Sequence, residues 1–255
     1  MGVHRRDFIK LLGFTGTIVA LGGLTPPLIK LVSPRFPKPA STEYPRSKLV
    51  WEEGSPVKAS ELEINNAYVF EYPMKGIFSI LINVGDENGN PIRIPPLQVP
   101  LLMQSLQEEP ETPTQESIQD LTTAGRGGFY EIPGGVGPFQ SIIAYNGVCQ
   151  HFACQYPQLT YIPPGEKPPQ ELPEATRGSV LFCKCHGSVY DPYRGAAVLR
   201  GPAQRPLPTI ILEWSQDTDE LYAAGLAGNT IAGKFCNTCG ELVGDKVIVR
   251  PATTA

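Results

Sequence analysis

The chain has 255 residues and a formal net charge of −4 at pH 7, from 21 Lys and Arg against 25 Asp and Glu. Its hydrophobic content of 41% is enough for one medium-sized domain with appendages. The acidic balance, without a basic patch in the sequence, excludes nucleic acid as an expected partner. The 27 Pro and 26 Gly residues predict turns and short strands, and therefore an all-β fold class.

The first 32 residues differ in composition from the rest. The run His4-Arg5-Arg6-Asp7-Phe8-Ile9-Lys10 resembles a twin-arginine export signal, with His4 where Ser or Thr is usual. The uncharged stretch Leu11–Ile29 would reach about 28 Å as a helix, close to the hydrocarbon thickness of a bilayer. We expect residues 1–32 to be a retained signal-anchor with one transmembrane helix and a cytoplasmic N-terminus. A cleaved signal peptide is the alternative.

A linker and a globular domain follow. Residues 33–47 are polar and proline-rich, which is typical of a semi-rigid linker, and residues 48–255 form the expected domain. Residues 95–128 are rich in Pro, Gln and Glu and are interpreted as an exposed insertion, with a solvated loop preferred over a docking segment. The strands expected between turn signals are Ala67–Tyr72, Phe78–Val84, Ser141–Asn146, Ser179–Phe182, Thr209–Trp214, Leu221–Ala224 and Lys246–Arg250.

Two short segments hold four of the six cysteines and two of the three histidines. They are Cys149-Gln150-His151-Phe152-Ala153-Cys154 and Cys183-Lys184-Cys185-His186-Gly187-Ser188. Thiolate is a soft anionic ligand and imidazole a neutral one, so the pattern suggests a metal site with unlike ligand pairs. A Cys2His2 zinc site could use the same ligands, although zinc motifs usually pair Cys with Cys and His with His. Two plain disulfides with incidental histidines are the other alternative.

The pattern C-x-H-x-x-C followed by C-x-C-H-G-S resembles the Rieske iron–sulfur family. The resemblance implies one [2Fe–2S] cluster per chain, with Cys149 and Cys183 on one iron and His151 and His186 on the other. It also assigns Cys154 to a disulfide with Cys185, which ties the two loops together. Because two neutral imidazoles replace two thiolates, the reduction potential is expected to be high.

The resemblance extends to the residues that follow the second segment. It implies that Ser188 donates to a bridging sulfide and that Tyr190 donates to the sulfur of Cys149, and both bonds would raise the potential. An ordinary turn serine and a core tyrosine are the alternative. Gly201-Pro202 matches the family's proline loop, which covers the cluster. The cluster-binding subdomain is expected at about residues 146–207, within a Rieske fold of antiparallel sheets.

The remaining cysteine pair, Cys236 and Cys239, is not a haem attachment site, because Gly240 stands where a histidine is required. A local disulfide is preferred in an exported domain. Free thiols and a metal shared across a dimer are the alternatives.

The family resemblance implies a membrane-anchored, high-potential electron carrier of a cytochrome bc-type complex, similar to archaeal members. In that interpretation His186, with His151 beside it, accepts a hydrogen bond and a proton from quinol. The expected partners are a cytochrome b-type subunit and a cytochrome or blue-copper acceptor. The domain would lie on the outer, periplasmic side of the cytoplasmic membrane.

A second functional class remains open, the Rieske small subunit of arsenite oxidase, which relays electrons from a molybdenum subunit. A ring-hydroxylating oxygenase is disfavoured because no histidine follows His186 to form a mononuclear iron site.

Overall fold

The computed structural model describes residues 43–100, 129–166 and 178–252. Over these ranges the chain is built from strands, with two short 3-10 helices, η1 (Ala59–Glu61) and η2 (Pro192–Arg194). None of the helices in these ranges is long and apolar enough to cross a bilayer. The predicted signal-anchor of residues 1–32 and most of the predicted linker lie outside the described residues.

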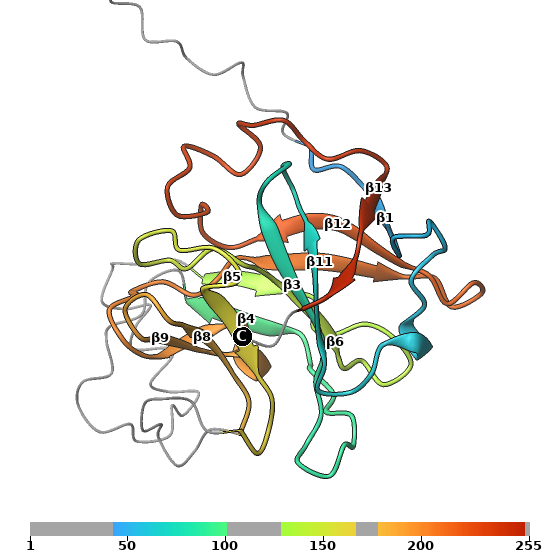
Figure 1. Cartoon of the computed structure of the whole chain (residues 1–255), viewed down its shortest axis with the longest axis horizontal. Helices are drawn as coiled ribbons and strands as arrows, with labels where there is room; N and C mark the ends of the chain where they lie inside the picture. Colours follow the sequence, from blue (N-terminus) through green and yellow to red (C-terminus); the bar gives the residue numbers. More distant parts are fainter. Residues whose placement is uncertain (1–42, 101–128, 167–177, 253–255) are drawn as a thin grey trace, which may run out of the picture. The chain divides into compact units, whose positions relative to one another are not determined.

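The larger of two main sheets, here the large sheet, contains eight strands in the order β13-β1-β12-β11-β6-β3-β2-β14 (Figure 1). Its strands are β1 (Ser47–Val50), β2 (Ala67–Glu71), β3 (Phe78–Asn83), β6 (Ile142–Asn146), β11 (Thr209–Trp214), β12 (Leu221–Ala227), β13 (Lys246–Ile248) and β14 (Arg250–Pro251). β13 pairs with β1, and β14 pairs with β2 at the opposite end of the order. One C-terminal segment therefore joins both edges, which leaves little open edge for pairing with another chain.

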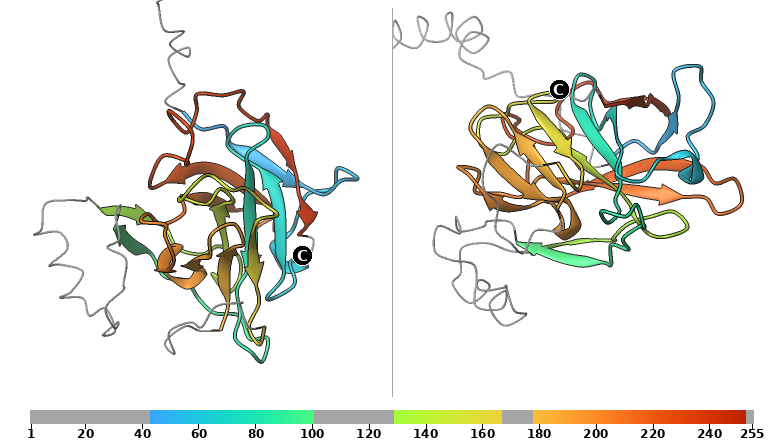
Figure 2. Two further views of the ribbon diagram at one scale, coloured as in Figure 1. Left: turned by 60° about the vertical axis from the view of Figure 1, so that its left-hand side comes forward. Right: turned by 60° about the horizontal axis from the view of Figure 1, so that its bottom comes forward.

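The small sheet has four antiparallel strands in the order β10-β9-β8-β7. They are β7 (Leu159–Ile162), β8 (Val180–Cys183), β9 (Ser188–Asp191) and β10 (Ala197–Arg200), all within the predicted cluster-binding subdomain. The small sheet lies beside the large one (Figures 1 and 2). One apolar core joins the two sheets, with Ile80, Ile82 and Tyr145 from the large sheet against Leu159 and Leu181 from the small one. This shared core fixes the small sheet on the large one.

A third, two-stranded sheet consists of β4 (Leu97–Pro100) and β5 (Phe129–Ile132). The prediction of an exposed insertion over residues 95–128 is therefore wrong at its start, where Val99 is buried and packs beside Gly195. Pro96 and Pro100 weaken the strand signal in the sequence, but Pro is accommodated at the edge of a sheet. Residues 101–128, and with them the rest of the predicted insertion, lie outside the described residues.

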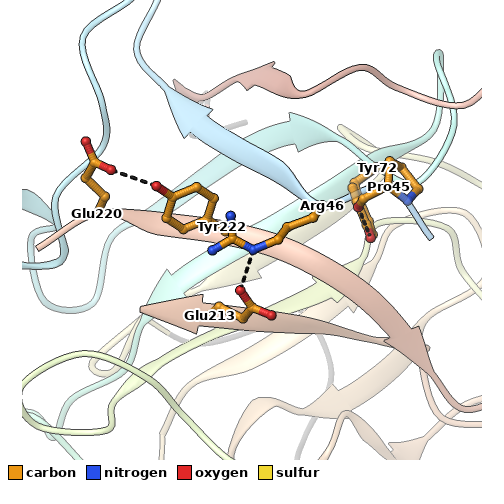
Figure 3. A network of polar contacts seen from close by, with 6 residues as sticks. All are labelled: Pro45, Arg46, Tyr72, Glu213, Glu220 and Tyr222. Carbon is orange, nitrogen blue, oxygen red and sulfur yellow. Dashed lines mark hydrogen bonds and ion pairs between the residues drawn. The ribbon is translucent and has the colours of Figure 1, made fainter. Parts of the chain in front are cut away.

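The end of the predicted linker belongs to the folded body. Ser47 begins β1, and the hydroxyl of Tyr72 donates to the carbonyl oxygen of Pro45 at 2.8 Å. The Arg46 side chain stacks on Tyr222 and bonds Glu213 (Figure 3). The predicted boundary after residue 47 is thus too late, because composition alone does not reveal that Arg46 has partners on β11 and β12.

Candidate metal centre

The first ligand loop follows β6. The amide of Cys149 donates to the carbonyl of Cys154 at 2.8 Å, and the amide of Ala153 donates back to the carbonyl of Cys149 at 3.0 Å. These reciprocal bonds fold residues 149–154 into a tight loop. The backbone conformation of this loop therefore determines the positions of the Cys149 and His151 side chains.

The second ligand loop is the turn between β8 and β9. Cys183 is the last residue of β8 and lies opposite Ser188, the first residue of β9. The amide of Gly187 closes the turn on the carbonyl of Cys183 at 2.9 Å. The hairpin therefore holds Cys183 in the sheet and places His186 at its tip.

The two loops are joined by the disulfide Cys154–Cys185, which confirms the predicted pairing. A backbone bond from the N–H of Lys184 to the carbonyl of Gln158, 2.8 Å long, extends the pairing of β7 and β8 to the second ligand loop. The sulfur of Cys183 lies within 4.8 Å of both disulfide sulfurs. A disulfide sulfur is not a thiolate, so Cys183 is the member of this group that offers a metal ligand.

Cys149 and Cys183 are free thiols, each 1% exposed. The interpretation of the two segments as plain disulfides is therefore wrong. The hydrogen bond from the Cys183 thiol lowers the pKa of Cys149 to about 5, and the same contact raises the pKa of Cys183. Two adjacent buried sulfurs of this kind can both bind a metal once deprotonated.

The two histidines lie on the outer side of these sulfurs. His151 is half-buried and His186 is exposed, and their ring centroids are 4.9 Å apart with the rings nearly perpendicular. The Nδ1 atom of His151 is buried and has no hydrogen-bond partner among the described residues. A buried imidazole nitrogen without a partner is unfavourable unless it binds a metal. The donor set, two buried sulfurs and two outer imidazoles, therefore fits a [2Fe–2S] cluster with mixed ligands.

A buried phenol lies beside the first sulfur. The Tyr190 hydroxyl is 3.2 Å from the Sγ of Cys149, as the family resemblance implies. Burial raises the pKa of Tyr190 well above its usual value, so the phenol keeps its proton and acts as the donor.

Ser188 is fully buried, and its Oγ accepts the amide hydrogen of Ala203 at 3.3 Å. The hydroxyl hydrogen of Ser188 therefore remains available to a second acceptor. Its bond to a bridging sulfide stays a prediction.

The proline loop lies against the second ligand loop. Gly201 has a φ of +100°, and a Cβ at this position would be 2.6 Å from both the Gly187 carbonyl oxygen and the Ser188 Cα. Only glycine permits this conformation and this approach. The predicted covering loop is thus in contact with the site, while the Pro202 side chain is exposed.

Sequence reasoning missed Phe152. Its side chain is 72% exposed, with ring centroids 4.1 Å from His151 and 5.7 Å from His186. The sequence did contain a signal for its exposure. Phe152 stands between the predicted ligand His151 and the disulfide cysteine Cys154, where an aromatic side chain cannot enter the core. Phe152 shields one side of the two imidazoles and presents an apolar surface beside them.

Comparison with known proteins defines the class of this centre. Residues 137–211 match the model of the Rieske [2Fe-2S] domain. The chain therefore carries a Rieske domain, its cofactor is a Rieske-type [2Fe–2S] cluster, and its role is electron transfer. The sulfurs of Cys149 and Cys183 are neighbours, and so are the rings of His151 and His186. The role of these four residues as cluster ligands, and their division between the two irons, stay predictions.

Two individual proteins resemble the chain over most of its length. Iodate reductase subunit IdrB of Denitromonas iodatirespirans is 23% identical over 239 residues, which are 94% of this chain and 89% of IdrB. The solved structure of the soluble domain of Rieske protein II (soxF) from Sulfolobus acidocaldarius has a TM-score of 0.48 and 22% identity, over 77% of this chain and 85% of that chain.

Proposed function

We propose that this chain is the membrane-anchored Rieske subunit of a quinol-oxidising, cytochrome bc-type complex. The observation that carries the proposal is the exposed imidazole of His186, which has the apolar ring of Phe152 beside it. A quinol needs a hydrogen-bond acceptor for its hydroxyl group and an apolar contact for its ring. These two side chains offer both at one place on the surface.

The bound cluster supplies a high-potential acceptor for one electron. The residues of the chain supply the rest of the chemistry. With the cluster bound, the imidazole nitrogen of His186 that does not bind iron would accept a hydrogen bond from the quinol hydroxyl and would take its proton. The site would thus take one of the two electrons and one of the two protons of quinol, and the second electron and proton would have to leave through another subunit. His151 is the adjacent second imidazole. As hydrogen-bond donors, Tyr190 and Ser188 would stabilise the reduced form of the bound cluster and so keep its potential high.

The proposal includes a location and partners. Residues 1–32 would anchor the chain in the cytoplasmic membrane, with the Rieske domain on the outer side. A cytochrome b-type subunit would form the quinol site, and a cytochrome or blue-copper protein would take the electron. If the domain moves between them, shortening the linker before residue 43 should slow turnover and leave the cluster spectrum unchanged.

Native membranes that contain the full-length chain provide the test. A short-chain quinol should reduce the cluster, detected by electron paramagnetic resonance (EPR), and a quinol-site inhibitor should block the reduction. Phe152→Ala should keep the cluster spectrum but raise the quinol concentration needed. Reduction by dithionite but not by quinol would contradict the proposal.

A second candidate is an electron-relay subunit of a soluble-substrate oxidoreductase, of the arsenite oxidase type predicted as the alternative. The similarity to an iodate reductase subunit over 94% of this chain favours it. Purification of the tagged chain from native membranes separates the two candidates. A co-purifying cytochrome b supports quinol oxidation, whereas a molybdenum-containing subunit without cytochrome b supports the relay.

A further inference from the structure

A loop beyond the Rieske match packs against the first ligand loop. This segment, residues 229–240, follows β12 and is here called the C-terminal loop. A Cβ on Gly233 would lie 3.3 Å from the Cβ of Ala153, which places the two loops in direct contact. Ile231 and Ala232 are buried in the same apolar core as Val148, the residue before the first cluster ligand.

The side chain of Gln150 connects the two loops and is only 4% exposed. The donors and acceptors around it assign its amide orientation. In that orientation Nε2 donates to the carbonyl of Thr230 at 3.2 Å, and the amide oxygen accepts from the N–H of Ala232 at 3.3 Å. Both bonds are made to backbone groups of the C-terminal loop, so they depend on its conformation.

The C-terminal loop is held in shape from within. Its cysteines form the disulfide Cys236–Cys239, which confirms the preferred prediction for this pair. The amide of Asn237 accepts from the N–H of Ile231 at 2.8 Å and donates to the carbonyl of Asn229 at 3.3 Å. Asn237 therefore fixes the backbone on both sides of Thr230, the residue that Gln150 contacts.

The backbone of Gln150 leads on to the cluster sulfur. Its N–H donates to the hydroxyl oxygen of Tyr190 at 3.1 Å, and that oxygen is 3.2 Å from the Sγ of Cys149. A phenol has one hydrogen. Since its oxygen accepts from Gln150, the hydrogen is directed to the sulfur.

We propose that Gln150 is a positioning residue for the Tyr190–Cys149 hydrogen bond, and that the C-terminal loop holds Gln150 in place through Asn237. The reduction potential of the cluster then depends on a segment outside the matched residues 137–211. The inference rests on the Rieske cluster but not on quinol as the substrate. It is therefore tested on the isolated protein without any quinol.

Redox titration of the cluster-loaded protein, followed by EPR, provides the first test. Gln150→Ala and Asn237→Ala should each lower the midpoint potential, and Asn237→Asp should restore most of it because it keeps an acceptor for Ile231. In a Tyr190→Phe background, Gln150→Ala should produce no further shift, since the bond that it positions is already absent. Equal shifts in both backgrounds, or no shift in either, would overturn the proposal. Gln216→Ala, an exposed glutamine in the β11–β12 turn, is the matched control and should leave the potential unchanged.

Hydrogen exchange tests the same proposal in a variant that does not retain its cluster and so cannot be titrated. The amide of Ala153 is bonded to the Cys149 carbonyl and reports on the first ligand loop. Asn237→Ala should speed its exchange about tenfold or more through local opening, while amides of β3 keep their parental rates. Unchanged exchange at Ala153 would show that the C-terminal loop does not hold the ligand loop.

Discussion

The guanidinium carbon of Arg46 lies 3.8 Å from the centre of the Tyr222 ring, and its Nε donates to Glu213 at 2.7 Å (Figure 3). Lys48 approaches the same ring, 5.4 Å from its centre, and bonds Glu220. The start of β1 is thus fixed on β11 and β12. In the proposed membrane-anchored protein, the tether would therefore end before Pro45.

Arg46→Ala should lower the free energy of unfolding by about 1 kcal/mol, because it removes a cation–π contact and an exposed ion pair together. Urea denaturation measures the change. Arg250→Ala is the control, since Arg250 forms a similarly exposed pair with Glu52. Arg250→Ala should lower the free energy of unfolding by less than Arg46→Ala does. Equal decreases in the two variants would show that the Tyr222 contact contributes nothing to stability.

Tyr190→Phe should retain the cluster and lower its midpoint potential. The variant removes the donor to Cys149 without changing the packing of the ring. If about 1 kcal/mol of the bond energy distinguishes the two oxidation states, the shift is roughly 40 mV for one electron. Redox titration checks it, and a parental midpoint in this variant would show that the bond has no electronic effect.

Ser188→Ala should lower the potential and the stability together. The buried amide of Ala203 loses its acceptor, which costs about 1–3 kcal/mol in the free energy of unfolding. Ser179→Ala is a matched control, because its buried hydroxyl bonds Tyr193. Ser179→Ala should lower the free energy of unfolding by an amount similar to Ser188→Ala and leave the midpoint potential unchanged. A parental potential in Ser188→Ala would remove Ser188 from the set of donors.

Removal of the inter-loop disulfide, by Cys154→Ser with Cys185→Ser, should lower the free energy of unfolding by about 4 kcal/mol, given the sequence separation of 31. Removal of Cys236–Cys239, with a separation of 3, should cost much less because the loop it closes is short. Urea denaturation compares them, and the reverse order would contradict the loop-closure argument.

His186→Ala should abolish the cluster, because one iron would lose one of its two predicted nitrogen ligands. Iron and acid-labile sulfide analysis of the purified variant checks this. Lys184→Ala, an exposed change in the same turn, should retain parental iron content. Full iron and sulfide content in His186→Ala would exclude this histidine as a ligand.

The sequence predicted elements best where apolar alternation is strong. Thr209–Trp214 matches β11 at both ends, and Phe78–Val84 exceeds β3 by one residue. Strands β1, β4, β5, β7, β9 and β10 were missed, since each is four residues long and its pairing partner decides whether it forms. Short strands of this kind leave too weak a local pattern to be detected.

The candidate site was predictable because metal ligands have characteristic types and spacings. All four predicted ligands and the disulfide partners Cys154 and Cys185 come from two contiguous segments. The contact of Gln150 with Thr230 was not predictable, since the residues are far apart in sequence and both are ordinary polar types. The exposure of Phe152 likewise depends on the loop conformation, which the motif alone does not give.

The central claim is a binuclear iron centre that two imidazoles and two thiolates bind within the described loops. The most direct measurement is electron–nuclear double resonance of the reduced protein, grown with ¹⁵N-labelled histidine. We predict two strongly coupled histidine nitrogens on a cluster of two irons and two sulfides per chain. A cluster without nitrogen coupling, or a single zinc ion in its place, would contradict it.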